Sequence, residues 1–284
     1  MLLLIDAGNT RIKWTIPALD EPGVLPPRWL HTGSVSHADI TTLGTNWVGL
    51  AIGRVLISNV AGDQVQCLLE EVLRSAAPAA ELVRFRSSAA CAGLKNGYRQ
   101  PTQLGSDRFA SAIAAHALYP QRALIVATCG TATTIDAVSP EGIFLGGMIL
   151  PGLQLMAQAL AKNTAQLPQV AASLSLNYAF ADNTDQAIVS GCIHAQVGAI
   201  VQAHDALAAT QDLPVNCVIS GGAAVYLTAH LGISCQHVEN LVLTGLFVVA
   251  SSMPAPIIEP SACALDSAVD VAVDSPSYQP NDLV

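Results

Sequence analysis

The chain has 284 residues, of which 51% are hydrophobic and 12% are charged, so it is long enough for two compact lobes and most of its length must be packed. The formal net charge is −9, and all twelve Lys and Arg lie before residue 163, which leaves no basic stripe for nucleic acid. No apolar run reaches the roughly 18 residues that span a bilayer, and the N-terminal run lacks the basic residue of a signal peptide. Seven cysteines without a C-x-x-C pair and seven histidines without ligand spacing argue against a disulfide framework and a bound metal cluster. We therefore expect a cytoplasmic protein with reduced thiols and no membrane contact.

Residues 2–5 are apolar and predict a buried strand, which leads directly into a turn of Asp, Gly, Asn and Thr. Residues 11–14 alternate polar and apolar side chains and predict a second strand. Asp6, at the end of the first strand, is a candidate ligand for a metal ion, and Gly8 lets a ligand approach the backbone closely. The polar turn residues and the backbone N–H groups offer donors to phosphate oxygens. An ordinary hairpin, whose polar residues serve only the turn, is the alternative.

The next part of the chain predicts a mixed sheet with helices packed on it. Four prolines within residues 17–34 favour a loop or a hairpin connection, and residues 41–50 are ambiguous. Strands are expected at 54–60 and 81–86. Between them, residues 64–76 show the apolar spacing of a helix.

A loop containing Asn-Gly and Pro precedes the segment Gly-Ser-Asp-Arg, which opens a helix expected at 108–119. Ser106 or Asp107 could cap that helix, and capping is the plain explanation of the aspartate. Arg108 places a permanent cation beside Asp107, and the ring and hydroxyl of the nearby Tyr98 could stack on a ligand and hydrogen-bond to it. These neighbours favour a functional role for Asp107.

The strand–turn–strand pattern returns at residues 124–138, where an apolar strand enters a Gly/Thr turn at 128–134 and a second strand leaves it. The repetition predicts a duplicated fold whose two loops face one cleft and hold a phosphate chain from opposite sides. Cys129 lies inside this second loop, and it is the one thiol whose position places it near the expected phosphate site.

The remaining elements follow in order. A strand at 144–151 contains Gly146-Gly147, which suggests close approach of a backbone or a ligand, and a helix is expected at 153–162. An irregular connection at 168–183 leads to a long helix at 186–210, for which Thr184 is a candidate cap. A strand at 215–219 ends in Gly221-Gly222, which is either a surface for an adenine ring or a tight turn, and a last helix ends near Met253. Residues 254–284 predict a disordered acidic tail.

The paired loops resemble those of the actin and sugar-kinase superfamily, and five motifs in order resemble the type III pantothenate kinase family, also called the Bvg accessory factor family. The resemblance covers roughly residues 1–250. The motifs are Asp6–Thr10, Gly105–Arg108, Gly130–Asp136, Gly146–Gly152 and Asn183-Thr184.

The resemblance implies an α/β fold of two duplicated ribonuclease H-like lobes, with mixed sheets and flanking helices, at residues 1–122 and 123–253. It implies ATP-dependent phosphorylation of pantothenate by a homodimer, with Asp107 as the general base and Mg²⁺ held by Asp6 through ATP. The implied ATP-binding residues are Asp6, Ala7, Gly8, Asn9, Thr10, Arg11, Ile12, Lys13 and Thr131. The implied pantothenate-binding residues are Tyr98, Gly105, Ser106, Asp107, Arg108 and, from the partner subunit, Thr184.

One position departs from the family pattern. The second loop of the family begins with an Asp that helps to hold a potassium or ammonium ion, and this chain has Thr128 there. A neutral hydroxyl coordinates a hard cation less well than a carboxylate, so we expect either a much higher potassium requirement or near indifference to the ion. A phosphatase, a kinase for another small hydroxy acid and a non-enzymatic regulator on the same fold remain alternatives.

Overall fold

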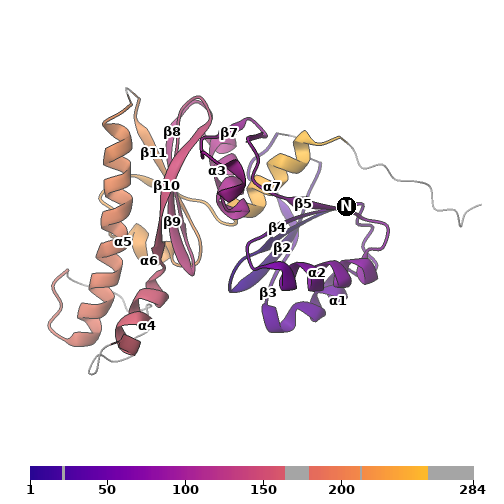
Figure 1. Ribbon diagram of the computed structural model, residues 1–284, viewed down its shortest axis with the longest axis horizontal. Helices are drawn as coiled ribbons and strands as arrows, with labels where there is room; N and C mark the ends of the chain where they lie inside the picture. Colours follow the sequence, from indigo (N-terminus) through magenta and orange to yellow (C-terminus); the bar gives the residue numbers. More distant parts are fainter. Residues whose placement is uncertain (21–22, 164–178, 212, 255–284) are drawn as a thin grey trace, which may run out of the picture.

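The computed structural model describes residues 1–20, 23–163, 179–211 and 213–254. Its strands form two mixed sheets (Figure 1). The first sheet has the order β3-β2-β1-β4-β5, and the run β10-β9-β8-β11-β12 of the second repeats that topology strand for strand. The first sheet consists of β1 (Leu2–Ala7), β2 (Arg11–Pro17), β3 (Trp29–Ser36), β4 (Arg54–Asn59) and β5 (Glu81–Phe85). The second consists of β8 (Ala123–Cys129), β9 (Ala132–Val138), β10 (Ile143–Pro151), β11 (Val215–Ser220) and β12 (Cys235–His237), with β7 (Leu94–Asn96) and β6 (Ala90–Cys91) beyond β10. The predicted duplication is therefore present.

The helices cover the faces of these sheets. Two of them, α3 and α7, lie side by side between the two sheets in Figure 1. No helix in the described part of the chain is both long and apolar enough to cross a membrane. The helices are α1 (Leu43–Trp47), α2 (Asp63–Ala76), α3 (Ser106–Leu118), α4 (Leu153–Asn163), α5 (Thr184–Ala208), α6 (Ala224–Thr228) and α7 (Leu241–Ser252), with 3-10 turns at η1 (His37–Thr42) and η2 (Pro101–Gln103).

Period-two alternation divides the apolar side chains among three cores, because successive strand residues face opposite sides of a sheet. Leu3 and Ile5 of β1 pack with α1 and α2, whereas Leu2 and Leu4 belong to a central core shared by both sheets, α3 and α7. In the second sheet, Val126 faces the central core, and its neighbours along β8 face the core beneath α5. The helices α3 and α5 therefore cover opposite faces of the second sheet.

The crossing of α3 and α7 depends on a glycine. A Cβ atom on Gly245 would lie 1.9 Å from the carbonyl oxygen of Ala110, so only a glycine lets the two helix backbones approach this closely. The C-terminal helix α7 also packs on β1 and β4, which ties the end of the described chain to its first strand.

Several sequence expectations need correction. The expected hairpin connection is present, because β2 and β3 are antiparallel neighbours, but residues 29–34 within it belong to β3. The side chains of β3 are half-buried or exposed and therefore lack the apolar pattern of a strand. Backbone pairing with β2 fixes it, and Gly33 lies against the indole of Trp14. The ambiguous residues 41–50 contain α1. The tail expected beyond residue 254 and most of the irregular connection at 168–183 lie outside the described residues.

Candidate active site

The first loop is a closed turn at the end of β1. The backbone N–H of Gly8 donates to the carbonyl oxygen of Arg11 at 3.1 Å, and Nε2 of His37 lies 2.8 Å from the carbonyl oxygen of Gly8. Asp6 is partly buried and lies opposite Lys13 in the register of β1 and β2, so a cation and a carboxylate face the same side. Sequence reasoning missed His37, because nothing in its spacing connects it to the loop.

The other predicted phosphate-binding residues differ in which groups a phosphate ligand could reach. Ala7 and Ile12 are fully buried, so they can offer a ligand only their backbone groups. The guanidinium of Arg11 is exposed and donates through Nε to Oγ of Ser34 at 2.9 Å. Asn9 is exposed at the tip of the turn, where its side chain is accessible to a ligand.

The two loops meet. Oγ1 of Thr10 and Oγ1 of Thr131 lie 2.6 Å apart, although 121 positions separate them in the sequence. The second loop rests on the start of α4, since the N–H of Gly152 donates to the carbonyl oxygen of Thr131 at 2.9 Å, and a Cβ on Gly152 would lie 2.1 Å from the carbonyl oxygen of Gly130. The two predicted loops therefore lie directly against one another.

The turn after β11 packs on the second loop. Gly221 has a φ of +95°, and a Cβ there would lie 2.3 Å from the carbonyl oxygen of Cys129, so this glycine is required by the close approach. A Cβ on Gly222 would meet no described atom within 4 Å, which leaves open backbone surface for a flat ring. Burial raises the pKa of the Cys129 thiol to about 12, so this cysteine stays protonated and unreactive.

Asp107 lies in the first turn of α3. The helix begins at Ser106 with Gly105 as its N-cap, so the expected capping by Ser106 or Asp107 is wrong. Oγ of Ser106 instead lies 2.8 Å from Oγ of Ser58 in β4, and both hydroxyls are buried. Oδ1 of Asp107 accepts from the backbone N–H of Arg108 at 2.8 Å.

Arg108 is the centre of a buried polar network. Its Nη1 donates to the hydroxyl of Tyr98 at 3.0 Å, and its Nε donates to Oδ1 of Asp136 at 3.1 Å, with Nη2 donating to the same oxygen. The guanidinium also lies 5.7 Å from the ring centre of Phe144. Sequence reasoning assigned no role to Asp136, which ends the Gly130–Asp136 motif, because its partner Arg108 lies on another element.

Three carboxylates therefore converge from different elements. Burial, with a smaller contribution from the charge of Asp107, raises the pKa of Asp6 to about 7, while Lys13 opposes the shift. Burial raises the pKa of Asp107, and burial with the nearby Asp107 charge raises the pKa of Asp136 to about 6 against the effect of Arg108. Asp6 and Asp136 thus both lie near the charge of Asp107, and each of the three carboxyls gains a proton more readily than an exposed aspartate.

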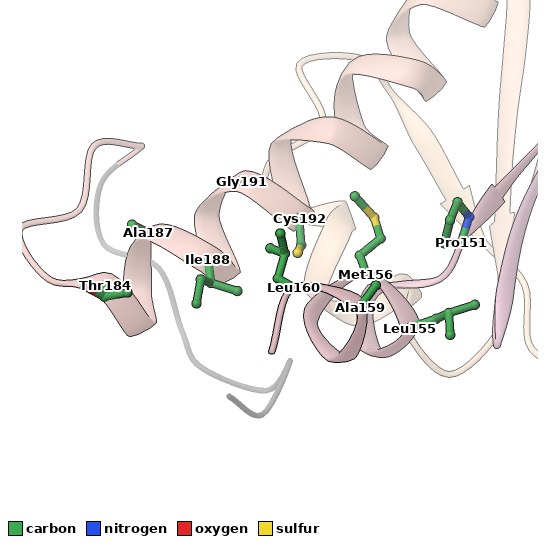
Figure 2. Close-up of a pocket in the computed structure, with 10 residues that line it drawn as sticks. All are labelled: Pro151, Leu155, Met156, Ala159, Leu160, Thr184, Ala187, Ile188, Gly191 and Cys192. Atoms are coloured by element: carbon green, nitrogen blue, oxygen red, sulfur yellow. The ribbon is translucent and has the colours of Figure 1, made fainter. Parts of the chain in front are cut away.

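Thr184 is not brought into this network. It begins α5, on the opposite face of the second sheet from α3, and lines an apolar pocket of about 670 Å³ between α4 and α5 (Figure 2). Asn183 caps α5 through a 3.0 Å bond from the N–H of Gln186 to its Oδ1. Within one chain, Thr184 and Arg108 belong to helices that pack on opposite faces of the second sheet.

Thr128 faces the central side of the second sheet. Its Oγ1 and that of Thr134, its register partner on β9, are buried and have no hydrogen-bond partner among the described residues. Buried hydroxyls without partners are uncommon and indicate a place for a water molecule or an ion.

In the part of the chain that the structure describes, no group of three or more His, Cys, Asp and Glu side chains is arranged to hold a metal ion.

The duplicated sheets and the two loops that meet define an α/β protein with the fold of the actin and sugar-kinase superfamily. Solved structures of this fold match most of the chain at low sequence identity. A Campylobacter jejuni protein described as a Baf family transcriptional activator has a TM-score of 0.56 and 21% identity, and the match covers 87% of this chain and 96% of that one. A glucokinase from an Antarctic psychrotroph has a TM-score of 0.50 and 11% identity, with 88% and 99% covered. The expected fold class is confirmed.

The sequence comparisons identify the family. The profile described as type III pantothenate kinase matches residues 2–206. The type III pantothenate kinase of Janthinobacterium sp. (strain Marseille) is 55% identical over 254 residues, covering 88% of this chain and 97% of its own. That of Herminiimonas arsenicoxydans is 53% identical over 251 residues, with the same shares covered. The chain belongs to the type III pantothenate kinase family, as its five motifs predicted.

Proposed function

We propose that the protein transfers the γ-phosphoryl group of ATP to the primary hydroxyl of pantothenate, giving 4′-phosphopantothenate, the first intermediate on the way to coenzyme A. Membership of the kinase family supports the reaction. The observation that carries the assignment is that the start of α3 lies beside the first loop: Ser106, next to Asp107, contacts Ser58 at 2.8 Å, and Ser58 is the register partner of Asp6. A proton acceptor and a phosphate site must be neighbours for direct phosphoryl transfer.

The first loop and Thr131 would bind the phosphate chain. Gly8, Asn9 and Thr10 offer backbone and side-chain donors, and Lys13 supplies a positive charge opposite Asp6. The partly buried Asp6, with its raised pKa, fits a Mg²⁺ ion carried by ATP, since a divalent cation favours the ionised carboxylate. Mg²⁺ supplies charge neutralisation to the transferring phosphoryl group.

Asp107 would accept the proton of the attacking hydroxyl. Its pKa is raised by burial, which brings it nearer to the working pH and makes it a better base than an exposed aspartate. Tyr98, Arg108 and the backbone of Gly105 and Ser106 would hold the acceptor, with the Arg108 guanidinium paired to the carboxylate of pantothenate.

We also propose a homodimer in which Thr184 of one copy completes the acceptor site of the other, because Thr184 and Arg108 lie on opposite faces of the second sheet in one chain. Exposed apolar side chains lie beside the site on β10 and α4. They are Leu145, Met148, Ile149, Leu155 and Leu160. An isologous contact through these elements would bury this apolar surface and place α5 against the neighbouring site.

We propose that residues 1–122 and 123–253 act as the two lobes that close on the nucleotide, and that the enzyme works in the cytoplasm. The free thiols of the described cysteines suit a reducing compartment.

We propose a weak monovalent-cation site at Thr128 and Thr134, whose buried hydroxyls lack partners among the described residues. Without a carboxylate ligand, half-maximal activation should need far more potassium than the low millimolar range, or activity should be indifferent to the ion. Initial rates in potassium-free Tris buffer, titrated with potassium and with ammonium, measure this. Saturation at low millimolar potassium that is lost in Thr128→Val would instead demonstrate a strong site.

A coupled assay of ADP formation tests the function. Pantothenate should be the preferred acceptor in a panel of small hydroxy acids, with little ADP formed in its absence. ADP formation that is equal with every acceptor, or with none, would contradict the proposal. Release of inorganic phosphate from phosphorylated acceptors would instead identify a phosphatase.

A further inference from the structure

The ion pair between Arg108 and Asp136 is the most deeply buried one in the described part of the chain. The side chains are 7% and 1% exposed, respectively. Removing both charges from water costs free energy that the attraction between them largely offsets, so such a pair adds little to the stability of the fold. We therefore expect a functional role of the pair. The pair joins the first turn of α3 to the middle of β9, beside Asp107.

The geometry of the pair fixes the direction of the guanidinium. Asp136 occupies Nε and Nη2 of Arg108, and the Tyr98 hydroxyl accepts from Nη1 at 3.0 Å. A guanidinium has five N–H groups in one plane. Among the bonds made by the described residues, one N–H on each terminal nitrogen therefore remains for an acceptor.

Gly147 of β10 leaves room for this arrangement. It lies opposite Asp136 in the register of β9 and β10, and a Cβ atom there would lie 2.1 Å from Oδ1 of Asp136 and 2.8 Å from Nη2 of Arg108. Any side chain at Gly147 would displace the pair. Two residues from separate strands are thus specialised to hold one arginine.

We propose that Asp136 is a positioning residue that, with Gly147, presets Arg108 to receive the carboxylate of the acceptor. Asp136 touches no substrate and acts through Arg108, so its removal weakens acceptor binding more than nucleotide binding. The inference rests on the proposed function, because that function assigns the acceptor carboxylate to Arg108.

The test compares four variants with the wild-type enzyme. Asp136→Asn and Gly147→Ala should raise the KM for pantothenate by roughly 10- to 100-fold, the loss expected when a buried charge loses its partner, and should change the KM for ATP by less than about 3-fold. Calorimetric titration with pantothenate should show the same weakening. Gly147→Ala changes no charge and provides a second route if Asp136→Asn fails to fold. Because its Cβ would also lie 2.5 Å from the carbonyl oxygen of Ile135, its Tm is measured alongside the KM values. Glu81→Gln, which breaks the ion pair of the buried Arg54 with the 43% exposed Glu81 in the first sheet, is the control and should leave both KM values unchanged.

Arg108→Ala separates the two possible failures. If it raises the KM for pantothenate while Asp136→Asn and Gly147→Ala do not, the pair is only structural and the inference is wrong. If Arg108→Ala leaves pantothenate binding intact, the assignment of the acceptor site itself is wrong. Equal losses for ATP and pantothenate in Asp136→Asn, with a lowered Tm, would also overturn the positioning role.

Discussion

At the scale of single residues, the cleft gives three aspartates different environments. Asp136 is neutralised by a bidentate arginine, Asp6 faces Lys13 and the phosphate loop, and Asp107 accepts one backbone N–H and has no side-chain cation bonded to it among the described residues. These environments, rather than the residue type, support the three roles that we propose for them: a support, a cation ligand and a base.

Asp107→Asn keeps the size of the side chain and removes the proton acceptor. Turnover should fall by roughly two to four orders of magnitude, since that is the usual contribution of a general base. Calorimetry should still detect pantothenate binding. Near-normal turnover in this variant would show that Asp107 only lines the pocket.

Asp6 should make the ligand-free protein less stable at alkaline pH. Its folded pKa of about 7 exceeds the unfolded value of 3.8, so the folded protein binds more protons between these values and the free energy of unfolding falls as the pH rises through this window. Asp6→Asn should therefore raise the Tm by roughly 10 °C at pH 8 and hardly at all at pH 4, since the difference of about 3 between the two pKa values corresponds to about 4 kcal/mol and each kcal/mol to about 2–4 °C.

Differential scanning calorimetry of wild type and Asp6→Asn at both pH values measures this effect. Glu71→Gln, on the exposed face of α2, is the control and should show no pH-dependent gain. A destabilised Asp6→Asn protein at pH 8 would mean that the carboxylate is compensated in the folded state. The same variant should lose activity, because it lacks the proposed Mg²⁺ ligand.

At the scale of elements, the sequence predicted what local patterns encode. Apolar runs ending in Gly/Thr turns located both loops, and helical spacing located α2 and α5. Strand β3 was not predicted because its pairing with the backbone of β2, rather than an apolar pattern, defines it. The role of Asp136 was not predicted because its partner lies 28 positions away, on another element. Pairings distant in sequence leave no local pattern.

The α3–α7 crossing is an example of such a pairing and yields a prediction. Gly245→Ala places a methyl group against the carbonyl oxygen of Ala110, so the helices must separate, and stability should fall by roughly 1–3 kcal/mol or more. Gly198→Ala is a matched control, because a Cβ there meets no described atom within 4 Å, and it should be neutral or stabilising by up to about 1 kcal/mol. Urea unfolding measures both. Equal stability of the two variants would contradict the close crossing.

At the scale of the whole molecule, the proposed site is incomplete in one chain, because Thr184 lies across the second sheet from Arg108. Ile149→Asp should break the proposed dimer, since it puts a charge on a side chain that is 66% exposed on β10. Light scattering should then give 29.4 kDa instead of about twice that mass, with a raised KM for pantothenate.

The control for that variant is Val48→Asp. Val48 is 68% exposed and lies after α1 in the first lobe, away from β10, so this variant should remain dimeric and active. A fully active wild-type monomer at working concentration would refute the shared site.

The central claim is that one cleft joins the γ-phosphate of ATP to the hydroxyl of pantothenate. Phosphorus NMR of a reaction with wild-type enzyme, ATP, Mg²⁺ and pantothenate follows every phosphorus atom without coupling enzymes. The account predicts ADP and one new phosphomonoester on the primary hydroxyl, in equal amounts, and almost none of either with Asp107→Asn. Inorganic phosphate in place of the phosphomonoester, or an undiminished rate in Asp107→Asn, would contradict it.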